Sequence, residues 1–165
     1  MMVRLVLLTL LFSFQIAQAA EPKPFAGFQH DPKKPISITA DQLDLSRTKQ
    51  QAAFRGNVQV QQANSLLTAD ELEVFYTDNK TSNQKIQRFI ATGNVKITNG
   101  SEVATGQWAR YDLTSSLIEM GGKVMLEQQG NHISGDSLII DLKKGEGKVK
   151  ATPGSRVKTL FMPKD

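Results

Sequence analysis

The sequence predicts an all-β fold: a twisted stack of short antiparallel strands that stays open at both ends. Three observations predict it. From Ile36 onward, apolar and polar residues alternate with the period of two that half-buried strands require. No long window sustains the 3.6-residue period of an amphipathic helix, and turn-forming residues recur at short, regular intervals. A unit of about 30 residues is also repeated along the chain, which predicts stacking of equivalent units.

The N-terminal segment, residues 1–19, has the three parts of a secretory signal peptide. Arg4 precedes an apolar run from Leu5 to Phe14, and Ala17-Gln18-Ala19 is a small-x-small cleavage pattern. A retained membrane anchor is the alternative, but the apolar run is shorter than the roughly 20 residues that span a bilayer. We therefore expect cleavage after Ala19 and export of the chain.

An extended leader is expected over residues 20–35, because this segment contains four prolines and shows no periodicity. The folded domain is expected over residues 36–163. Its alternation is clearest at apolar pairs two residues apart, and these pairs indicate the buried face of successive strands: Ile36 and Ile38, Val58 and Val60, Val95 and Ile97, Val124 and Leu126, and Leu138 and Ile140.

Composition excludes several classes of function. The chain carries 20 Lys and Arg against 16 Asp and Glu, and the charges are scattered, which argues against a dedicated nucleic-acid site. Cysteine is absent, so disulfides, thiol catalysis and cysteine-based metal sites are excluded. Packing and backbone pairing must therefore hold the fold.

The repeated unit has four copies, which begin near Ile38, Leu67, Val103 and Ile133. Each copy opens with an apolar residue and a small-residue corner, and closes with a glycine that precedes another alternating segment. Glycine supplies a positive φ or a close approach of the backbone at such a position. The closing glycines are Gly56, Gly93, Gly122 and Gly154.

The opening corners carry an aspartate at Asp41, Asp70 and Asp136, and the third copy has Gly106 where we align the acid. We expect each aspartate to hold its corner by accepting a hydrogen bond from an amide two residues on. Residues a whole repeat apart cannot surround one reacting atom, so we interpret them as corners and not as catalytic acids. Asn99-Gly100 predicts a tight hairpin.

Catalytic motifs are missing from the sequence. There is no Gly-x-Ser-x-Gly nucleophile motif and no glycine-rich phosphate loop that leads into a helix. We therefore predict that the protein is not an enzyme and uses no metal or other cofactor.

Two edges follow from the open stack. The first strand, near residues 36–40, and the last, near residues 156–162, would each present unpaired backbone groups. Such edges favour the addition of a strand from another molecule. The edge residues that we expect to take part are Ile36, Ser37, Ile38, Val157, Thr159 and Phe161.

The apolar residues expected to face inward exceed what a slender roll requires. They form either a packed core or a groove that is partly open to acyl chains, and periodicity does not choose between these alternatives. It also leaves open which of Trp108 and Tyr111 faces inward. The inward candidates are Ile36, Ile38, Leu43, Leu45, Phe54, Val58, Leu72, Val74, Phe89, Val95, Tyr111, Leu113, Val124, Leu126, Leu138 and Ile140.

Several segments, taken in order, resemble the OstA-like family of periplasmic lipopolysaccharide-transport proteins. They are PISITADQLDL, RGNVQV, TGNVKI, ATGQWARYDL, ISGDSLIID and GSRVKTLFMP, and they extend from about Pro35 to Pro163. The resemblance implies a twisted, boat-like β-jellyroll. It also implies that members join head to tail into a periplasmic bridge, along which lipopolysaccharide moves with the acyl chains of lipid A inside the groove.

The resemblance assigns roles to particular residues. Ile36 and Ile38 would lie at the N-terminal lip, where the inner-membrane Lpt complex docks, and Phe89, Tyr111 and Leu113 would lie inside the groove. The strand RVKTLFM would be the C-terminal edge, which meets the next copy or the outer-membrane Lpt translocon. A repeat-built structural or adhesive module without lipid cargo is the alternative, and it predicts a fully packed interior.

Overall fold

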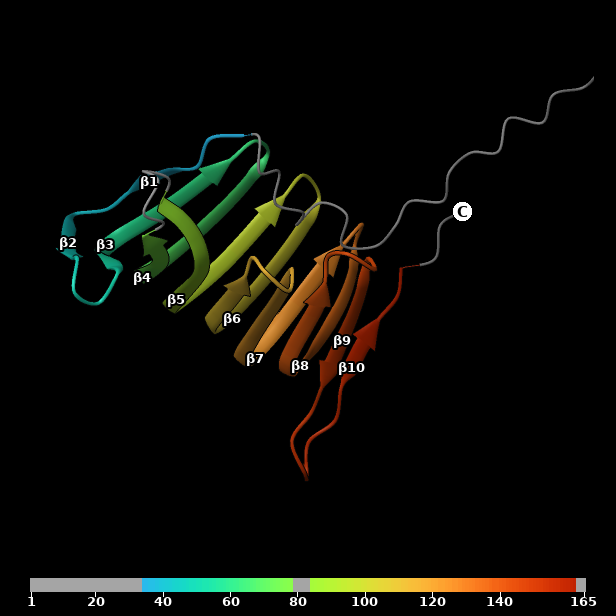
Figure 1. The fold of residues 1–165 in the computed structure, drawn as a ribbon. Helices are drawn as coiled ribbons and strands as arrows, with labels where there is room; N and C mark the ends of the chain where they lie inside the picture. The colour runs from blue at the N-terminus through green and yellow to red at the C-terminus, as the bar shows by residue number, and fades with distance from the viewer. Residues whose placement is uncertain (1–33, 79–83, 163–165) are drawn as a thin grey trace, which may run out of the picture.

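The computed structural model describes residues 34–78 and 84–162, so the expected signal peptide and most of the leader lie outside the described residues. In the described part, ten strands form one antiparallel sheet that does not close into a barrel. Figure 1 shows the strands side by side along a slender stack, with β1 and β2 at one end and β9 and β10 at the other. The all-β prediction is confirmed. Within these residues no helix is long and apolar enough to cross a membrane.

From β3 to β8 the strands lie in chain order, and each pairs with the next. The strand bounds are β1 Ser37–Thr39, β2 Gln42–Ser46, β3 Gln51–Gln62, β4 Ser65–Asp78, β5 Gln84–Asn99, β6 Glu102–Asp112, β7 Leu117–Gln128, β8 Asn131–Asp141, β9 Glu146–Lys150 and β10 Lys158–Leu160.

Each long strand contributes to two parts of the sheet, because the end strands pair with different halves of their neighbours. β1 pairs with residues 59–61 of β3, and β2 pairs with residues 51–55 of the same strand. At the other end, β10 pairs with residues 132–134 of β8 and β9 pairs with residues 137–141. We call the part between β1 and β10 the short flank, and the part between β2 and β9 the long flank.

A line of β-bulges separates the two flanks, and we call this line the crease. In β3, Gly56 (φ 74°) and Asn57 (φ 47°) both adopt left-handed conformations where the register with β4 shifts. The same pair recurs at Gly93 and Asn94 in β5. Two residues on one strand then oppose one on the next, which bends the strand and folds the sheet. Glycine is required because a Cβ on Gly93 would lie 2.8 Å from Cβ of Asp70.

The predicted closing glycines therefore have positive φ, but their place in the fold was predicted incorrectly. Gly56, Gly93 and Gly122 lie inside continuous strands and not between two strands. Gly154 (φ 90°) lies in the loop before β10, and a Cβ added there would meet no atom within 4 Å. The fourth copy of the unit thus ends in a loop and forms no bulge.

The aspartate corners are also held differently from the prediction. Asp41 accepts a hydrogen bond from Nδ2 of Asn57, and Asp70 accepts one from Asn94, each at 2.8 Å. The donors are therefore side chains in the bulge of the adjacent strand and not amides two residues on. The prediction was wrong because a local turn pattern does not reveal which strand lies alongside.

The third copy of the unit was aligned one residue out of register. Gly106 pairs with Val95, as Ala69 pairs with Val58, so Gly106 occupies the place of the small residue and not of the acid. Gln107 takes the place of the acid, since a Cβ on Gly122 would lie 2.5 Å from Cβ of Gln107. The crease is therefore continuous, with an amide in place of one carboxylate.

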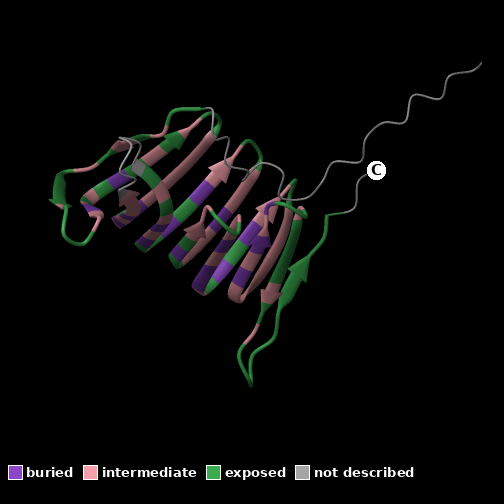
Figure 2. Cartoon of the chain, in the orientation of Figure 1, coloured by how far each residue is buried: buried purple, intermediate pink, exposed green. Residues whose placement is uncertain are grey.

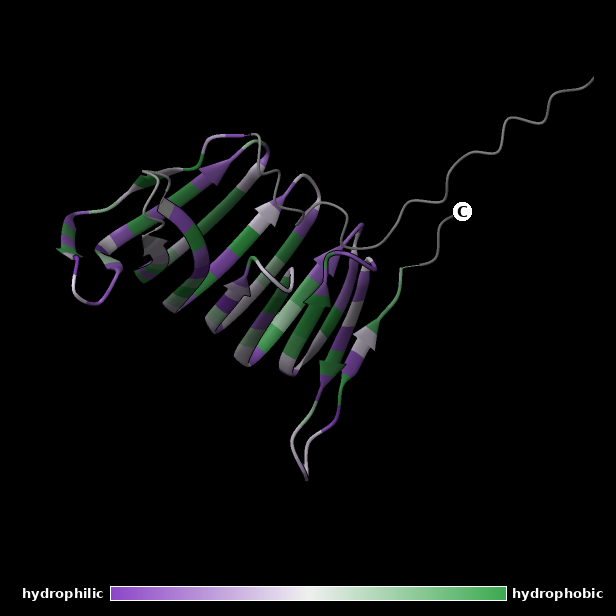
Figure 3. Cartoon of the chain, in the orientation of Figure 1, coloured by the Kyte–Doolittle hydropathy of each residue, from purple (hydrophilic) through white to green (hydrophobic). Residues whose placement is uncertain are grey.

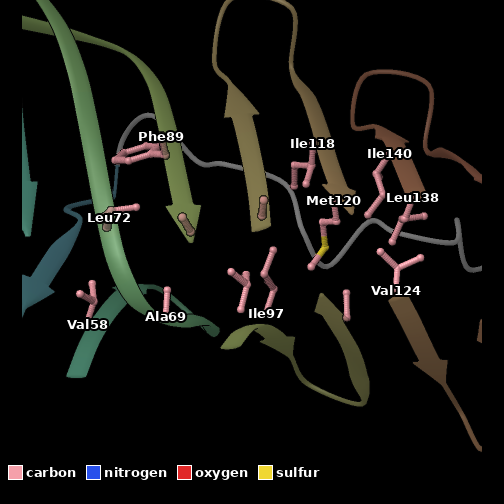
Figure 4. Packing of buried hydrophobic residues seen from close by; sticks show 14 of the residues in the cluster. Val58, Ala69, Leu72, Phe89, Ile97, Ile118, Met120, Val124, Leu138 and Ile140 are labelled. Atoms are coloured by element: carbon pink, nitrogen blue, oxygen red, sulfur yellow. The ribbon is translucent and has the colours of Figure 1, made fainter. Parts of the chain in front are cut away.

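The core lies between the two flanks. Figure 4 shows Val58, Ile97 and Val124 of the short flank facing Leu72, Met120 and Leu138 of the long flank. Leu72, Met120, Leu138 and Ile140 have no exposed surface. Figure 3 shows hydrophobic and hydrophilic residues alternating along the strands, which agrees with the predicted period of two.

Leu43 and Leu45 were predicted to face the interior, and they are instead 49% and 71% exposed. They pair with Phe54 and Ala52, so they lie on the apolar side of the sheet. However, β2 is the end strand of the long flank, and no described strand covers its far side. Alternation predicts the face on which a residue lies but not whether another strand covers it.

The predicted hairpin at Asn99-Gly100 is present, shifted by one residue. Asn99 pairs with Glu102, so the two loop residues are Gly100 and Ser101. Gly100 has a φ of 56°, which fits the first loop position of a two-residue turn.

Candidate functional site

An apolar cavity of about 100 Å³ lies between the flanks, in the half of the stack nearer β1 and β2. Side chains from both flanks line it, and nearly all of them are apolar. The lining residues are Ile36, Val60, Gln62, Ser65, Leu67, Leu72, Phe89, Ala91, Ile97, Ala109, Tyr111 and Ile118. An apolar pocket with a few polar groups at its margin is typical of ligand sites in proteins.

Two alanines leave space beside this cavity. In the row of the long flank nearest the crease, Leu72 pairs with Ala91 and Ala91 pairs with Ala109, before the row continues to Met120. Both alanines are buried, with exposures of 1% and 4%. Large side chains thus stand on either side of two small ones, and tight packing is interrupted where a leucine or methionine would otherwise fill the interior.

An aromatic pair forms one wall of the cavity. Phe89 and Tyr111 are neighbours on β5 and β6, with ring centroids 6.3 Å apart and an angle of 21° between the planes. Burial, with a smaller contribution from the negative charge of Asp112, raises the pKa of Tyr111 to about 12. The phenol is neutral at physiological pH, and the raised pKa reflects the apolar surroundings of this wall.

Three of the five predicted groove residues line the cavity: Ile36, Phe89 and Tyr111. Ile38 and Leu113 are half-buried and pack against the core without lining the cavity. The alternation left open whether Trp108 or Tyr111 of β6 faces inward. Tyr111 faces inward, whereas Trp108 is 41% exposed on the outer face, where it pairs with Gly121.

A row of polar side chains borders the interior at the hairpin ends of the short flank, and we call it the polar rim. By alternation from the buried residues of each strand, its members lie on the inner side of the sheet. Nδ2 of Asn99 donates to Oγ of Ser65 at 2.6 Å, and Nε2 of Gln128 donates to Oε1 of Glu102 at 2.5 Å. The other oxygen of Glu102 is buried and has no hydrogen-bond partner among the described residues. The rim comprises Gln62, Ser65, Asn99, Glu102, Gln128 and Asn131.

Sequence reasoning missed both the alanines and the polar rim. Single alanines and scattered glutamines and asparagines carry no local signal. The strand register, which aligns Ala91 with Ala109 and Asn99 with Ser65, brings them together.

The predicted edge residues lie at the two ends of the stack. Ser37 and Ile38 belong to β1, which pairs with β3 on one side and with no described strand on the other. Thr159 pairs with Ile133, while Val157 and Phe161 flank β10 and are 42% and 70% exposed. Figure 2 shows that β10 is exposed along its length. Leu160 and Met162 add exposed apolar surface that was not predicted.

Two sets of charge contacts lie on the outer surface. Arg55 forms ion pairs with Asp44 and Glu71, and the guanidinium of Arg88 lies 4.7 Å from the centre of the Phe75 ring. In the described part of the chain, no cluster of three or more His, Cys, Asp or Glu residues is arranged to hold a metal ion.

Comparison with known proteins assigns the family. Residues 37–146 match the family model for the LptA/(LptD N-terminal domain) LPS transport protein. The chain belongs to this family. It is 24% identical over 141 residues to the lipopolysaccharide export system protein LptA of Haemophilus influenzae, which covers 83% of this chain and 82% of LptA. An uncharacterized protein of Rhizobium meliloti is 31% identical over 160 residues, covering 94% of this chain and 85% of that relative.

A solved structure of this family has the same fold. LptH of Pseudomonas aeruginosa, described as the LptA-homologous periplasmic component of the conserved lipopolysaccharide transport device, superposes with a TM-score of 0.68. The match covers 79% of this chain and 96% of LptH at 19% identity, so it bears on the fold alone. The OstA-like resemblance and the open jellyroll are thereby confirmed.

Proposed function

We propose that this protein carries lipopolysaccharide through the periplasm, from the inner to the outer membrane, as part of a protein bridge. The apolar cavity between the flanks carries this proposal. A structural or adhesive module would gain stability from a fully packed interior, whereas here two buried alanines leave space beside an aromatic wall. Membership of a lipopolysaccharide-transport family supports the same function.

The interior suits an amphipathic ligand. Acyl chains of lipid A would occupy the space bordered by Phe89, Tyr111 and Ile36, where removal of apolar surface from water favours binding. The polar rim would face the sugar part, since its amides, hydroxyl and carboxylate offer both donors and acceptors. Such a protein holds and passes on its ligand without making or breaking covalent bonds.

Head-to-tail assembly is compatible with the direction of the end strands. β1 runs antiparallel to β3, and β10 runs antiparallel to β8. Because the strands between them alternate in direction, β1 and β10 run in opposite directions. The β10 of one copy can therefore pair antiparallel with the β1 of the next. The same holds for β2 and β9, so both flanks would continue from copy to copy.

The remaining expectations follow from this role. The N-terminal edge would receive lipid from the inner-membrane Lpt complex, and the C-terminal edge would meet the outer-membrane Lpt translocon. The signal peptide expected at residues 1–19 would deliver the protein to the periplasm. Ile36, which lies at the cavity and beside β1, would take part in both lipid entry and docking.

Filling the cavity tests the lipid site. Ala109→Leu adds an apolar side chain to the cavity, and we expect it to weaken binding of purified lipopolysaccharide by about tenfold or more while the protein stays folded. Thr105→Leu is the matched control, because it adds bulk to the outer face of the same strand. Ile36→Asp should weaken loading as well, since it places a charge at the apolar entrance. Equal binding by Ala109→Leu, Thr105→Leu and the wild type would refute the groove.

Removing the C-terminal edge tests the bridge. Without residues 156–165 the protein should lose concentration-dependent linear oligomers, as measured by sedimentation velocity across a dilution series. Lipid binding should persist in this variant, because the cavity lies in the other half of the stack. An unchanged size distribution would contradict assembly through this edge.

A further inference from the structure

A second cleft lies beside the crease near the C-terminal end of the stack. It has a volume of about 590 Å³ and is formed by β7, β8 and the segment that leads into β10. Three of its lining side chains are cationic: Lys123, Arg156 and Lys158. We call it the basic cleft. Met125, which also lines it, is 42% exposed on the outer face. The basic cleft shares no lining residue with the apolar cavity between the flanks, so the two are separate.

The crease departs from its own pattern at this point. In the first two bulges an asparagine donates its side-chain amide to an aspartate, from Asn57 to Asp41 and from Asn94 to Asp70. The third bulge has Lys123 in place of the asparagine and Gln107 in place of the aspartate. One negative charge is lost and one positive charge is gained relative to the other two bulges.

Lysine is also a poor residue for this backbone. Lys123 has a φ of 61°, a left-handed conformation that asparagine adopts more readily than lysine. Unfavourable backbone conformations persist where the surroundings hold them, and they are concentrated at functional sites. The use of lysine where the repeat elsewhere uses asparagine therefore suggests a role for the ammonium group.

The cations of the basic cleft are not neutralised by their neighbours. Lys123, Arg156 and Lys158 form no ion pair with any described residue. The acidic residue that lines the cleft is Asp136, whose carboxylate accepts hydrogen bonds from the backbone N–H and hydroxyl of Thr152 and from the hydroxyl of Ser155. These bonds fasten the loop that positions Arg156. Three cations and one carboxylate leave a net charge of +2.

We propose that the basic cleft binds a phosphate group, either as free phosphate or as the phosphate of a phosphorylated saccharide head group. A dianionic phosphate matches the net charge of the cleft, and guanidinium and ammonium groups form short, charge-assisted hydrogen bonds with phosphate oxygens. Ser134 and Ser155 provide hydroxyl donors in the same lining. The proposal does not depend on the apolar groove, so either can fail without the other.

The substitution Lys123→Asn tests the proposal and controls for folding at once. It restores the residue found in the other two bulges, so we expect the unfolding midpoint to be unchanged or raised. The charge in the cleft is removed, so we expect the Kd for inorganic phosphate to rise about tenfold. Binding would be followed through amide NMR shifts at positions 123, 155, 156 and 158, and by calorimetry. The matched control is Lys148→Asn on β9, which removes the same charge outside the cleft lining.

Two further titrations distinguish the source of the phosphate. A diphosphorylated disaccharide lipid and its dephosphorylated form are compared in the same uncharged detergent micelles. If the phosphorylated lipid binds more strongly than its dephosphorylated form, and Lys123→Asn abolishes this difference, the ligand is a phosphorylated head group. If only inorganic phosphate binds saturably, the ligand is the free anion. Each of these results supports the proposal. Equal phosphate affinities for the wild type, Lys123→Asn and Lys148→Asn would overturn it. A change in self-association without any change in phosphate binding would also overturn it.

Discussion

Gly93 is a position in the crease where a single added methyl group cannot be accommodated without displacing a neighbour. Its φ of 77° is left-handed, and holding alanine in that conformation costs about 1–2 kcal/mol. The new Cβ would also press on the Asp70 carboxylate and displace it from Asn94, whose hydrogen bond contributes about 0.5–1.5 kcal/mol. We therefore expect Gly93→Ala to lower the free energy of unfolding by about 1.5–3.5 kcal/mol.

Gly100→Ala is the matched control for this prediction. Gly100 has a φ of 56°, but a Cβ added there would meet no atom within 4 Å. The backbone cost alone should apply, about 1–2 kcal/mol. The excess loss in Gly93→Ala over Gly100→Ala measures the collision with the aspartate corner.

Urea unfolding, followed by the fluorescence of the single tryptophan, Trp108, gives both free energies. In the background Asp70→Gly the excess should disappear, because both the carboxylate and the Cβ that obstruct the new methyl group have been removed. Equal losses for Gly93→Ala and Gly100→Ala in the wild-type background would refute the role assigned to the bulge and its aspartate.

Three further predictions concern the core and two titratable side chains. Leu138→Ala should lower the free energy of unfolding, measured in urea, by about 2–5 kcal/mol, because Leu138 is fully buried. Leu45→Ala, at a position that is 71% exposed, should change this free energy by no more than about 0.5 kcal/mol. Similar losses in the two variants would contradict the assignment of the core. In Tyr76→Phe, which leaves Tyr111 as the one tyrosine, ultraviolet titration should show ionisation near the raised pKa of about 12. Because the pKa of Tyr111 is raised in the folded state, its contribution to stability is full below the ordinary tyrosine pKa and is lost as pH rises through about 12. Ionisation of Tyr111 at the ordinary pKa would contradict its burial. The backbone N–H of Thr152, followed by the hydroxyls of Ser155 and Thr152, lowers the pKa of Asp136. The ionised carboxylate of Asp136 therefore stabilises the fold above the ordinary carboxyl pKa, and this stabilisation is lost as pH falls through the lowered pKa. The unfolding midpoint should therefore fall less at acid pH in Asp136→Asn than in the wild type.

The repetitive parts of the fold could be predicted from sequence because their signals are local. Alternation placed Val58, Val95, Val124 and Leu138 in the core, and all four are buried. The glycines of the repeated unit indicated positive φ at three equivalent bulges. Both signals arise within a few residues of chain, where side-chain direction and backbone freedom are determined by neighbours in sequence.

Features that depend on which strand lies alongside could not be predicted in this way. The partner of Asp70 is Asn94, on the next strand. The register that places Gln107, and not Gly106, in the position of the acid is set by pairing with β5 and β7. Leu45 has the alternation of a core residue and is exposed because it lies on an end strand.

Only part of the candidate site could be predicted from the sequence, because the rest also depends on which strands lie side by side. The aromatic wall was found because Phe89 and Tyr111 are large and apolar, and the resemblance to a family pointed to them. The alanines that leave space beside the cavity, and the polar rim, become evident only when strands are aligned. A groove needs small side chains in its walls as well as large apolar ones, and small side chains leave little signal in a sequence.

The most direct test of the proposed groove compares two neighbouring positions on β6 in living cells. A photo-crosslinking residue at Tyr111 faces the cavity, whereas one at Arg110 faces outward, where the wild-type arginine pairs with Glu119 at 2.8 Å. If lipopolysaccharide travels between the flanks, crosslinks to it should form at position 111 and be absent or much weaker at position 110. Capture at both positions alike, or at neither, would contradict transport through the interior of this protein.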